Sequence, residues 1–274
     1  MPGLKGSKLS VIKKLKRHHA SPDLKNRDEA LRYISEHWNK LQRHNSEDRG
    51  TLIGLPYPYI VPSADPEARF QFEEQYYWDS YFTALGLTGP EHQQLVEGML
   101  ENLIYLFKRF GLIPNASRMY FTSRSQPPVM TSFIFHVYDT YNKDDAWLQS
   151  RIDVAIEEYQ QVWMHDAHPQ WHQVYKGLSR YYDVNVLHDL AEAESGWDMT
   201  PRFERKCLDF LPVDLNALLF KYESDFARAA DILKDKPMAA IWRKKAEERK
   251  MSMDKLMWQS CAVFTSTTTT SAKR

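Results

Sequence analysis

Short and long connections alternate between six helical patterns in this chain. Apolar residues recur every three or four positions in each pattern, which is the period of an amphipathic helix. Gly, Pro and Asn residues mark where the patterns stop. The patterns form three successive pairs with a short connection inside each pair: 74–87 with 91–110, 127–141 with 144–164, and 212–233 with 237–258. This arrangement predicts an all-α fold built from helix hairpins.

The long connections are expected to meet on one side of such a fold. A short turn makes two helices run antiparallel, so consecutive hairpins bring every long connection to the same rim. These rim segments are 56–73, 111–126 and 166–211, and they are the segments richest in Trp, Tyr, Arg, Asn and Asp. Long irregular loops in compact domains commonly carry function. Helix pairs repeating around an axis predict an α/α toroid, although a stacked solenoid would give the same local pattern.

The two flanks of the helical region differ from it in composition. Residues 28–44 carry apolar residues at helical spacing after a basic leader. A Ser/Thr-rich stretch, which is a poor helix former, follows the last helical pattern. We therefore expect a leader with one N-terminal helix (1–50), a helical domain (51–258) and a Ser/Thr-rich tail (259–274).

Composition narrows the class of partner and the compartment. Lys plus Arg number 36, as do Asp plus Glu, so no overall field favours nucleic acid or an acidic membrane. Cys207 and Cys261 are the only cysteines, so no disulfide framework is needed and a reducing cytosol is the simplest compartment. Residues 1–17 lack the apolar core of a signal peptide, and nothing later approaches the ~20 apolar residues of a membrane span. We expect a cytoplasmic protein with an uncharged small-molecule ligand and leave its oligomeric state open.

A candidate acid lies in the third rim segment, within Ala191-Glu-Ala-Glu-Ser-Gly-Trp-Asp198. Trp197 is a residue suited to wall a sugar-sized pocket. A low dielectric beside Asp198 would raise the pKa of its carboxyl group, which keeps a carboxyl protonated long enough to act as an acid. The alternative interpretation is a helix-capping Asp beside a core Trp.

The other two rim segments carry candidate ligands for hydroxyl groups. Trp78 and Asp79 lie among aromatics at a helix start, which indicates either core packing or a stacking platform with one polar anchor. Asn115, Arg124 and Gln126 offer forked donors and acceptors that suit vicinal hydroxyls. Gln126 also precedes a helix opened by prolines, so a structural role is an alternative for it.

Together the three segments resemble the trehalase family of glycoside hydrolases. The family's blocks resemble P-G-G-R-F-x-E-x-Y-x-W-D-S-Y, I-P-N-x-x-R-x-Y-x-x-x-R-S-Q-P-P and E-S-G-W-D, and all three occur here in that order within residues 55–258. The resemblance implies an (α/α)6 toroid, of which three hairpins make roughly the N-terminal half. It also implies hydrolysis of the disaccharide α,α-trehalose with inversion, without a metal or cofactor.

The resemblance assigns roles to individual positions. Asp198 matches the family's general acid. The positions that match residues lining the glucose sites are Trp78, Asp79, Asn115, Arg124, Ser125, Gln126 and Gly196, and we add Trp197 beside the acid. Inverting hydrolysis needs a second carboxylate about 6.5–9.5 Å from the acid. The family supplies it as a Glu in its second half, and no residue here corresponds to that Glu.

Two departures from the family's pattern bear on specificity. Gln71 stands where the family has an Arg, and Arg69 can replace that Arg only if the loop bulges. The family's R-P-E block is absent before the candidate acid. Arg180 is a plausible substitute as a sugar ligand, and a structural salt bridge is the alternative role for it. Another α-glucoside therefore remains an alternative substrate to trehalose.

The tail suggests why the second carboxylate is missing. Reading codons for residues 264–271 two bases later converts Thr-Thr junctions into codons for Tyr, His, Asn or Asp, and family members resemble Y-F-D-Y-N-Y-V at this place. We therefore hypothesise a reading-frame break after Trp258. Three interpretations stay open: a glycosidase by lineage, a sugar-binding remnant without turnover, or an inactive truncation product. For these 274 residues we expect little or no hydrolysis.

Overall fold

The computed structural model describes residues 24–64, 71–165, 167–168, 170–258 and 268–269. The chain divides into two compact units, Met1–Gln42 and Arg43–Arg274. In the first unit, α2 (Leu24–Leu41) confirms the helix expected over 28–44, although it begins and ends earlier. Leu31 and Ile34, two of its spaced apolar residues, are exposed. Apart from Gln42, everything described below belongs to the second unit.

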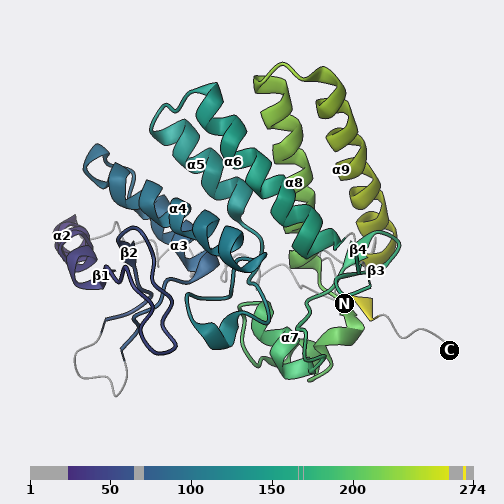
Figure 1. Ribbon diagram of the computed structural model, residues 1–274, viewed down its shortest axis with the longest axis horizontal. Coiled ribbons are helices and arrows are strands. Elements are labelled where there is room, and N and C mark those ends of the chain that lie inside the picture. Colours follow the sequence, from purple (N-terminus) through teal and green to yellow (C-terminus); the bar gives the residue numbers. More distant parts are fainter. Residues whose placement is uncertain (1–23, 65–70, 166, 169, 259–267, 270–274) are drawn as a thin grey trace, which may run out of the picture. The chain divides into compact units, whose positions relative to one another are not determined.

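Three helix hairpins form most of the second unit, as the sequence predicts (Figure 1). They are α3 (Tyr77–Gly86) with α4 (Gln93–Phe110), α5 (Met130–Thr140) with α6 (Asp145–Glu158), and α8 (Val213–Ile232) with α9 (Lys236–Met257). A wider π-helical turn, η3 (Tyr159–Met164), prolongs α6. The hairpins lie side by side, and α5 contacts both α4 and α8. The all-α class and the pairing of the helices are confirmed.

Local sequence explains where several of these helices begin and end. Asp144 caps α6 by accepting a hydrogen bond from the backbone N–H of Trp147 at 2.7 Å. Asp235 caps α9 in the same way, through the N–H of Met238 at 3.0 Å. Gly111 ends α4 in the left-handed region at φ +75°, which glycine adopts without a steric cost. These short-range signals set the hairpin turns.

Helix α3 begins at Tyr77, later than the pattern from residue 74 suggests. The preceding residue, Tyr76, is extended and forms an antiparallel bridge with Ala116. The backbone N–H of Gln75 donates to Ser117 Oγ at 2.9 Å. The chain just before α3 is therefore paired with the 111–126 segment.

A buried polar cluster joins α3, α5, α6 and α8. Glu158 accepts hydrogen bonds from the hydroxyls of Tyr77 and Tyr222, both at 2.9 Å. Both hydroxyls in turn accept from the backbone N–H of Met130. Burial raises the pKa of Glu158 to about 7, although the hydrogen bonds from Tyr222 and Tyr77 act to lower it. The hydrogen bonds around this carboxyl group therefore connect helices of all three hairpins.

Short elements occupy the segments before, within, between and after the hairpins. The helical ones are η1 (Pro90–His92), η2 (Met119–Phe121), α7 (His188–Glu194), η4 (Pro201–Phe203) and η5 (Cys207–Asp209). The strands are β1 (Gln42–Arg43), β2 (Tyr59–Ile60), β3 (Gln173–Tyr175), β4 (Leu178–Ser179), β5 (Phe210–Leu211) and β6 (Thr268–Thr269). β3 pairs with β4, and β5 pairs with β6, both antiparallel. Apart from β6, the expected tail and its proposed reading-frame break lie outside the described residues.

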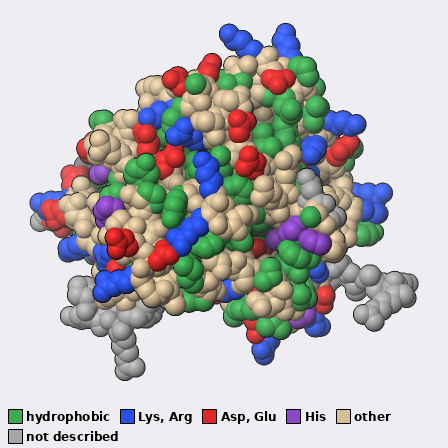
Figure 2. Space-filling view, viewed as in Figure 1, with side chains coloured by type: hydrophobic (Ala, Val, Ile, Leu, Met, Phe, Trp, Pro, Cys, Tyr) green, Lys and Arg blue, Asp and Glu red, His purple; other side chains and the backbone are tan. Residues whose placement is uncertain are grey.

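The surface agrees with the balanced composition. Lys and Arg side chains are interspersed with Asp and Glu side chains over the visible face (Figure 2). Among the residues that the structure describes, no helix combines the length and the apolar character needed to cross a bilayer.

Candidate active site

The three rim segments meet at one cavity of about 260 Å³, as the hairpin geometry predicts. Its walls come from residues on both sides of the start of α3, from the 111–126 segment and from the end of α7. The lining residues are Pro62, Phe72, Tyr76, Trp78, Asp79, Asn115, Phe121, Gln126, Ala193, Gly196 and Asp198. Six of the residues singled out from the sequence are therefore brought together: Trp78, Asp79, Asn115, Gln126, Gly196 and Asp198.

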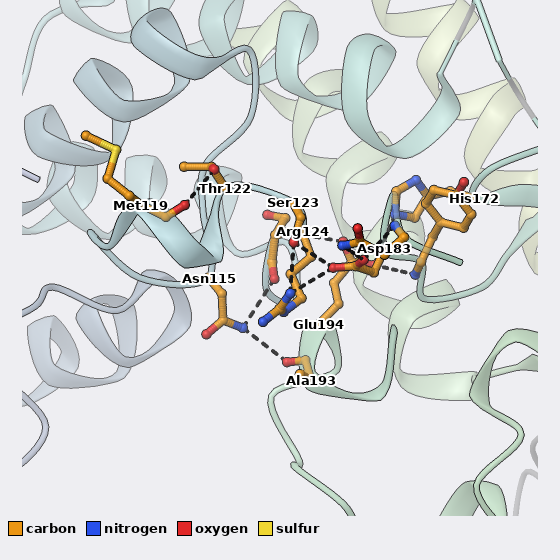
Figure 3. Close-up of polar contacts among 12 residues, drawn as sticks. Asn115, Met119, Thr122, Ser123, Arg124, His172, Asp183, Ala193 and Glu194 are labelled. Atoms are coloured by element: carbon orange, nitrogen blue, oxygen red, sulfur yellow. Dashed lines mark hydrogen bonds and ion pairs between the residues drawn. The ribbon is translucent and has the colours of Figure 1, made fainter. Parts of the chain in front are cut away.

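Two buried amides fix the positions of the cavity walls. Asn115 Nδ2 donates to the backbone carbonyl of Ala193 at 3.1 Å, which ties the 111–126 segment to α7 (Figure 3). Gln126 Oε1 accepts from the backbone N–H of Trp78 at 3.0 Å, which ties the same segment to α3. The expected structural role of Gln126 is therefore present, and the side chain also lines the cavity.

The two acids of the cavity have different environments. Burial raises the pKa of Asp79, hydrogen bonds from the Trp78 and Gln126 side chains act to lower it, and the charge of Asp198 adds a smaller increase. Asp198 itself is exposed. Trp197, with 52% of its surface exposed, does not enclose it. The expectation of an apolar environment around Asp198 is wrong for this structure, because Asp198 and its neighbours Trp197 and Met199 are all exposed.

Gly196, two residues before Asp198, has a special backbone conformation. The residue has φ +70°, in the left-handed region. A Cβ atom built on it would lie 2.6 Å from Cζ2 of Trp78, closer than real Cβ contacts. The indole of Trp78 therefore packs directly on the backbone of Gly196, and the Trp197 ring meets it edge-on at 6.1 Å between centroids. Asp198 follows at φ +55°.

A buried carboxylate behind the cavity connects the rim segments. Glu194, 1% exposed, accepts from the backbone N–H of Ser125 at 3.0 Å and from that of Tyr182 at 2.7 Å. It also accepts from Nε2 of His172 at 3.0 Å (Figure 3). Sequence reasoning missed this role. Its only signal was the position of the acid inside the Glu-Ser-Gly-Trp-Asp block.

Arg124 and Ser125 do not line the cavity. Arg124 is 9% exposed and pairs through Nη1 with Oδ2 of Asp183 at 2.8 Å. Burial acts to raise the pKa of Asp183, but hydrogen bonds from Asn185, Ser123 and Arg124 hold it below its ordinary value. Ser125 Oγ donates to the carbonyl of residue 113 at 2.7 Å. Both residues line a smaller cavity of about 90 Å³ instead.

Arg180 also lies away from the cavity lining. Its guanidinium donates to the backbone carbonyls of Trp171, Leu208 and Gln170 at 2.8–3.2 Å, and it lies over the ring of Tyr182 at 5.6 Å. Among the described residues Arg180 forms no salt bridge, which was the alternative role expected for it. Hydrogen bonds to backbone carbonyls hold the guanidinium instead. Its role as a sugar ligand stays a prediction. Arg69 lies outside the described residues.

An aromatic wall completes the cavity, and part of it was not foreseen. Tyr76 contacts Phe72 edge-on at 5.9 Å and Phe121 at 6.2 Å between ring centroids. Phe121 belongs to the short helix η2, and its place in an aromatic Met-Tyr-Phe turn was the available signal. Among the described residues, no group of three or more His, Cys, Asp or Glu side chains is placed to hold a metal ion.

Comparison with known proteins gives a consistent result. The family model described as Trehalase matches residues 5–189 and 170–265. Cytosolic neutral trehalase of Neurospora crassa is 32% identical over 277 residues, covering 76% of this chain and 36% of the relative. The corresponding protein of Emericella nidulans is 31% identical, covering 80% of this chain and 37% of the relative. The chain spans about a third of the length of these relatives.

Solved structures agree at the level of the fold. The neutral trehalase Nth1 from Saccharomyces cerevisiae superposes with a TM-score of 0.70 at 29% identity, covering 85% of this chain and 52% of that chain. A mannosylglycerate hydrolase of Thermus thermophilus superposes with a TM-score of 0.52 at 17% identity, covering 82% of this chain and 64% of that chain. The second likeness shows the fold alone.

Proposed function

This chain belongs to the trehalase family, and on that premise we propose that its rim cavity binds α,α-trehalose, with Asp198 as the general acid for inverting hydrolysis. One observation supports the proposal above all. Six residues that match the family's sugar-contact and acid positions, drawn from three separate segments, line one cavity. Chance placement of six such positions around one cavity is a poor explanation.

The cavity offers the chemistry that a glucose unit requires. The rings of Trp78, Tyr76 and Phe121 give apolar surface for the carbon face of the sugar. Asp79 and Asn115 present carboxylate and amide oxygens, which accept hydrogen bonds from hydroxyl groups. Hydrogen bonds from the Trp78 and Gln126 side chains act to lower the pKa of Asp79, which favours the carboxylate form that accepts hydrogen bonds. We assign Asp79 to hydroxyl binding.

Hydrolysis with inversion requires two carboxyl groups in separate roles. The acid protonates the leaving oxygen and the base activates a water, with the pair about 6.5–9.5 Å apart. Within the described residues the cavity is lined by two carboxylates, Asp79 and Asp198. Since Asp79 is assigned to the sugar, the described residues provide an acid without a base. We expect this chain to bind trehalose with little or no turnover, so sugar binding without catalysis is the second candidate function.

Substrate range and compartment complete the proposal. Arg180 is bound to backbone carbonyls, so it gives no support for a contact specific to trehalose, and another α-glucoside remains the alternative substrate. The relatives from Neurospora crassa and Emericella nidulans are named cytosolic. We propose the same compartment for this chain, with a disaccharide rather than a nucleic acid or membrane as its partner.

Azide tests the role of Asp198 without requiring a catalytic base. Azide attacks the anomeric carbon, the glycosidic bond breaks, and the proton of Asp198 passes to the leaving glucose oxygen. We expect azide-dependent release of glucose and β-glucosyl azide from trehalose by the unaltered chain. Asp198→Asn should bind trehalose and release about 10²-fold less. Equal azide-dependent release by both proteins would contradict the assignment.

A further inference from the structure

A second cavity of about 260 Å³ is lined by residues of the α8–α9 hairpin, of the β3–β4 hairpin and of η3. Figure 1 shows the β3–β4 hairpin beside the end of α9. It shares no lining residue with the rim cavity. Its deepest lining residues are Tyr159, Glu223 and Arg249, which are at most 5% exposed. Lys176 and Lys245 line it as exposed residues. The cavity thus has a buried polar floor and a basic mouth.

The floor contains an acceptor that lacks a donor. Glu223 Oε1 accepts from the hydroxyl of Tyr159 at 2.6 Å and from Arg249 Nε at 2.9 Å. Glu223 Oε2 is buried and has no hydrogen-bond partner among the described residues. The Nη1 group of Arg249 is bound to the carbonyl of Gly177 and to Asn216 Oδ1. An unpaired buried carboxylate oxygen is costly, so a ligand that donates a hydrogen bond there would be stabilised.

The mouth holds two ammonium groups available to an anion. Lys176 lies over the ring of Tyr175 at 5.1 Å, and Lys245 lies over the ring of Trp242 at 4.8 Å. Within the described part of the chain, neither ammonium forms an ion pair with a carboxylate. Lys176, at φ +49°, is held at the mouth by the tight β3–β4 turn. Glu248 also lines the cavity, but it pairs with Lys244 at 3.8 Å.

These charges select the class of ligand. A cationic donor for Glu223 would have to pass two lysine ammonium groups, which repel it. A hydroxyl donor carries no such penalty, and an anionic group at its other end would be attracted by the lysines at the mouth. The volume suits a ligand smaller than a drug-sized molecule. We propose that this cavity binds a sugar phosphate, with a hydroxyl on Glu223 and the phosphate between Lys176 and Lys245.

Titration calorimetry of the purified chain with glucose 6-phosphate tests the proposal, with inorganic phosphate and glucose as separate titrants. Glucose 6-phosphate should bind more tightly than either, because only it engages both the floor and the mouth. Absence of saturable binding, or equal affinity for inorganic phosphate, would overturn the proposal. Excess trehalose should leave the affinity unchanged, since the rim cavity is separate. Displacement by trehalose would place the ligand at the rim and overturn it too.

Variants locate the contacts. Lys176→Gln and Lys245→Gln should each weaken glucose 6-phosphate binding about three- to tenfold, whereas Lys255→Gln, an exposed lysine on the same helix α9, should not. Glu223→Gln should reduce the preference for glucose 6-phosphate over inorganic phosphate. If Glu223→Gln fails to fold, the Lys176→Gln/Lys245→Gln double variant carries the test, because both residues are exposed. Unchanged affinity in that double variant would refute the proposal.

Discussion

Gly196 is the residue on which the orientation of Asp198 depends most directly. It combines a left-handed backbone with a position where an added Cβ atom would lie 2.6 Å from the indole of Trp78. Gly111 has nearly the same φ, +75° against +70°, but a Cβ there would meet nothing within 4 Å. Alanine substitutions at Gly111 and Gly196 therefore separate the cost of backbone strain from the cost of the steric conflict with Trp78.

We expect Gly111→Ala to lower the free energy of unfolding by roughly 1–2 kcal/mol through strain alone. Gly196→Ala should cost a further ~1–3 kcal/mol, because Trp78 must move, and it should weaken trehalose binding. Chemical denaturation and calorimetry of both variants measure the two effects. Equal losses of stability and unchanged trehalose affinity in Gly196→Ala would show that the Trp78 contact is unimportant.

The end of α7 connects loops that are distant in sequence through Glu194. Glu194→Gln preserves size but replaces one acceptor oxygen with a donor, so one of the three donors facing it loses its partner. We expect a loss of about 2–3 kcal/mol in stability and faster amide exchange at Ser125 or at Tyr182, whichever faces the new amide group. Glu157→Gln, an exposed carboxylate on α6, is the matched control. Unchanged exchange at both amides in Glu194→Gln would refute a positioning role.

Glu158, at the end of α6, makes the packing of four helices dependent on pH. Its pKa is raised from 4.5 to about 7 by burial, so the unfolded chain releases this proton at a lower pH than the folded chain does. The contribution to stability is full below pH about 4.5 and is lost as pH rises to about 7. The total contribution of Glu158 to the free energy of unfolding that is lost over this pH range is roughly 3 kcal/mol.

Comparison with Glu158→Gln isolates this effect, because glutamine stays neutral. The unfolding free energy of the unaltered chain should fall relative to that of the variant between these pH values. Asp183, whose pKa is lowered, changes stability in the opposite direction at acid pH in both proteins, so it cancels in the difference. A pH-independent difference would contradict the raised pKa.

In the molecule as a whole, the sequence predicts what local rules decide. Apolar periodicity, Asp144, Asp235 and Gly111 are short-range signals, and they place the hairpins and hence the rim cavity. The exposure of Asp198 and the three donors around Glu194 depend on how separate segments pack. The bridge between Tyr76 and Ala116 that delays α3 also forms between segments. Periodicity carries no information about such contacts.

The central claim is that the rim cavity is a trehalose site, and titration calorimetry with α,α-trehalose tests it most directly. The account predicts saturable binding with one trehalose per chain, weakened at least about tenfold in Asp79→Asn by loss of a charged acceptor. Asp198→Asn should retain the affinity, because the acid is assigned to bond cleavage. Absence of binding by a chain that melts cooperatively, or unchanged affinity in Asp79→Asn, would contradict the claim.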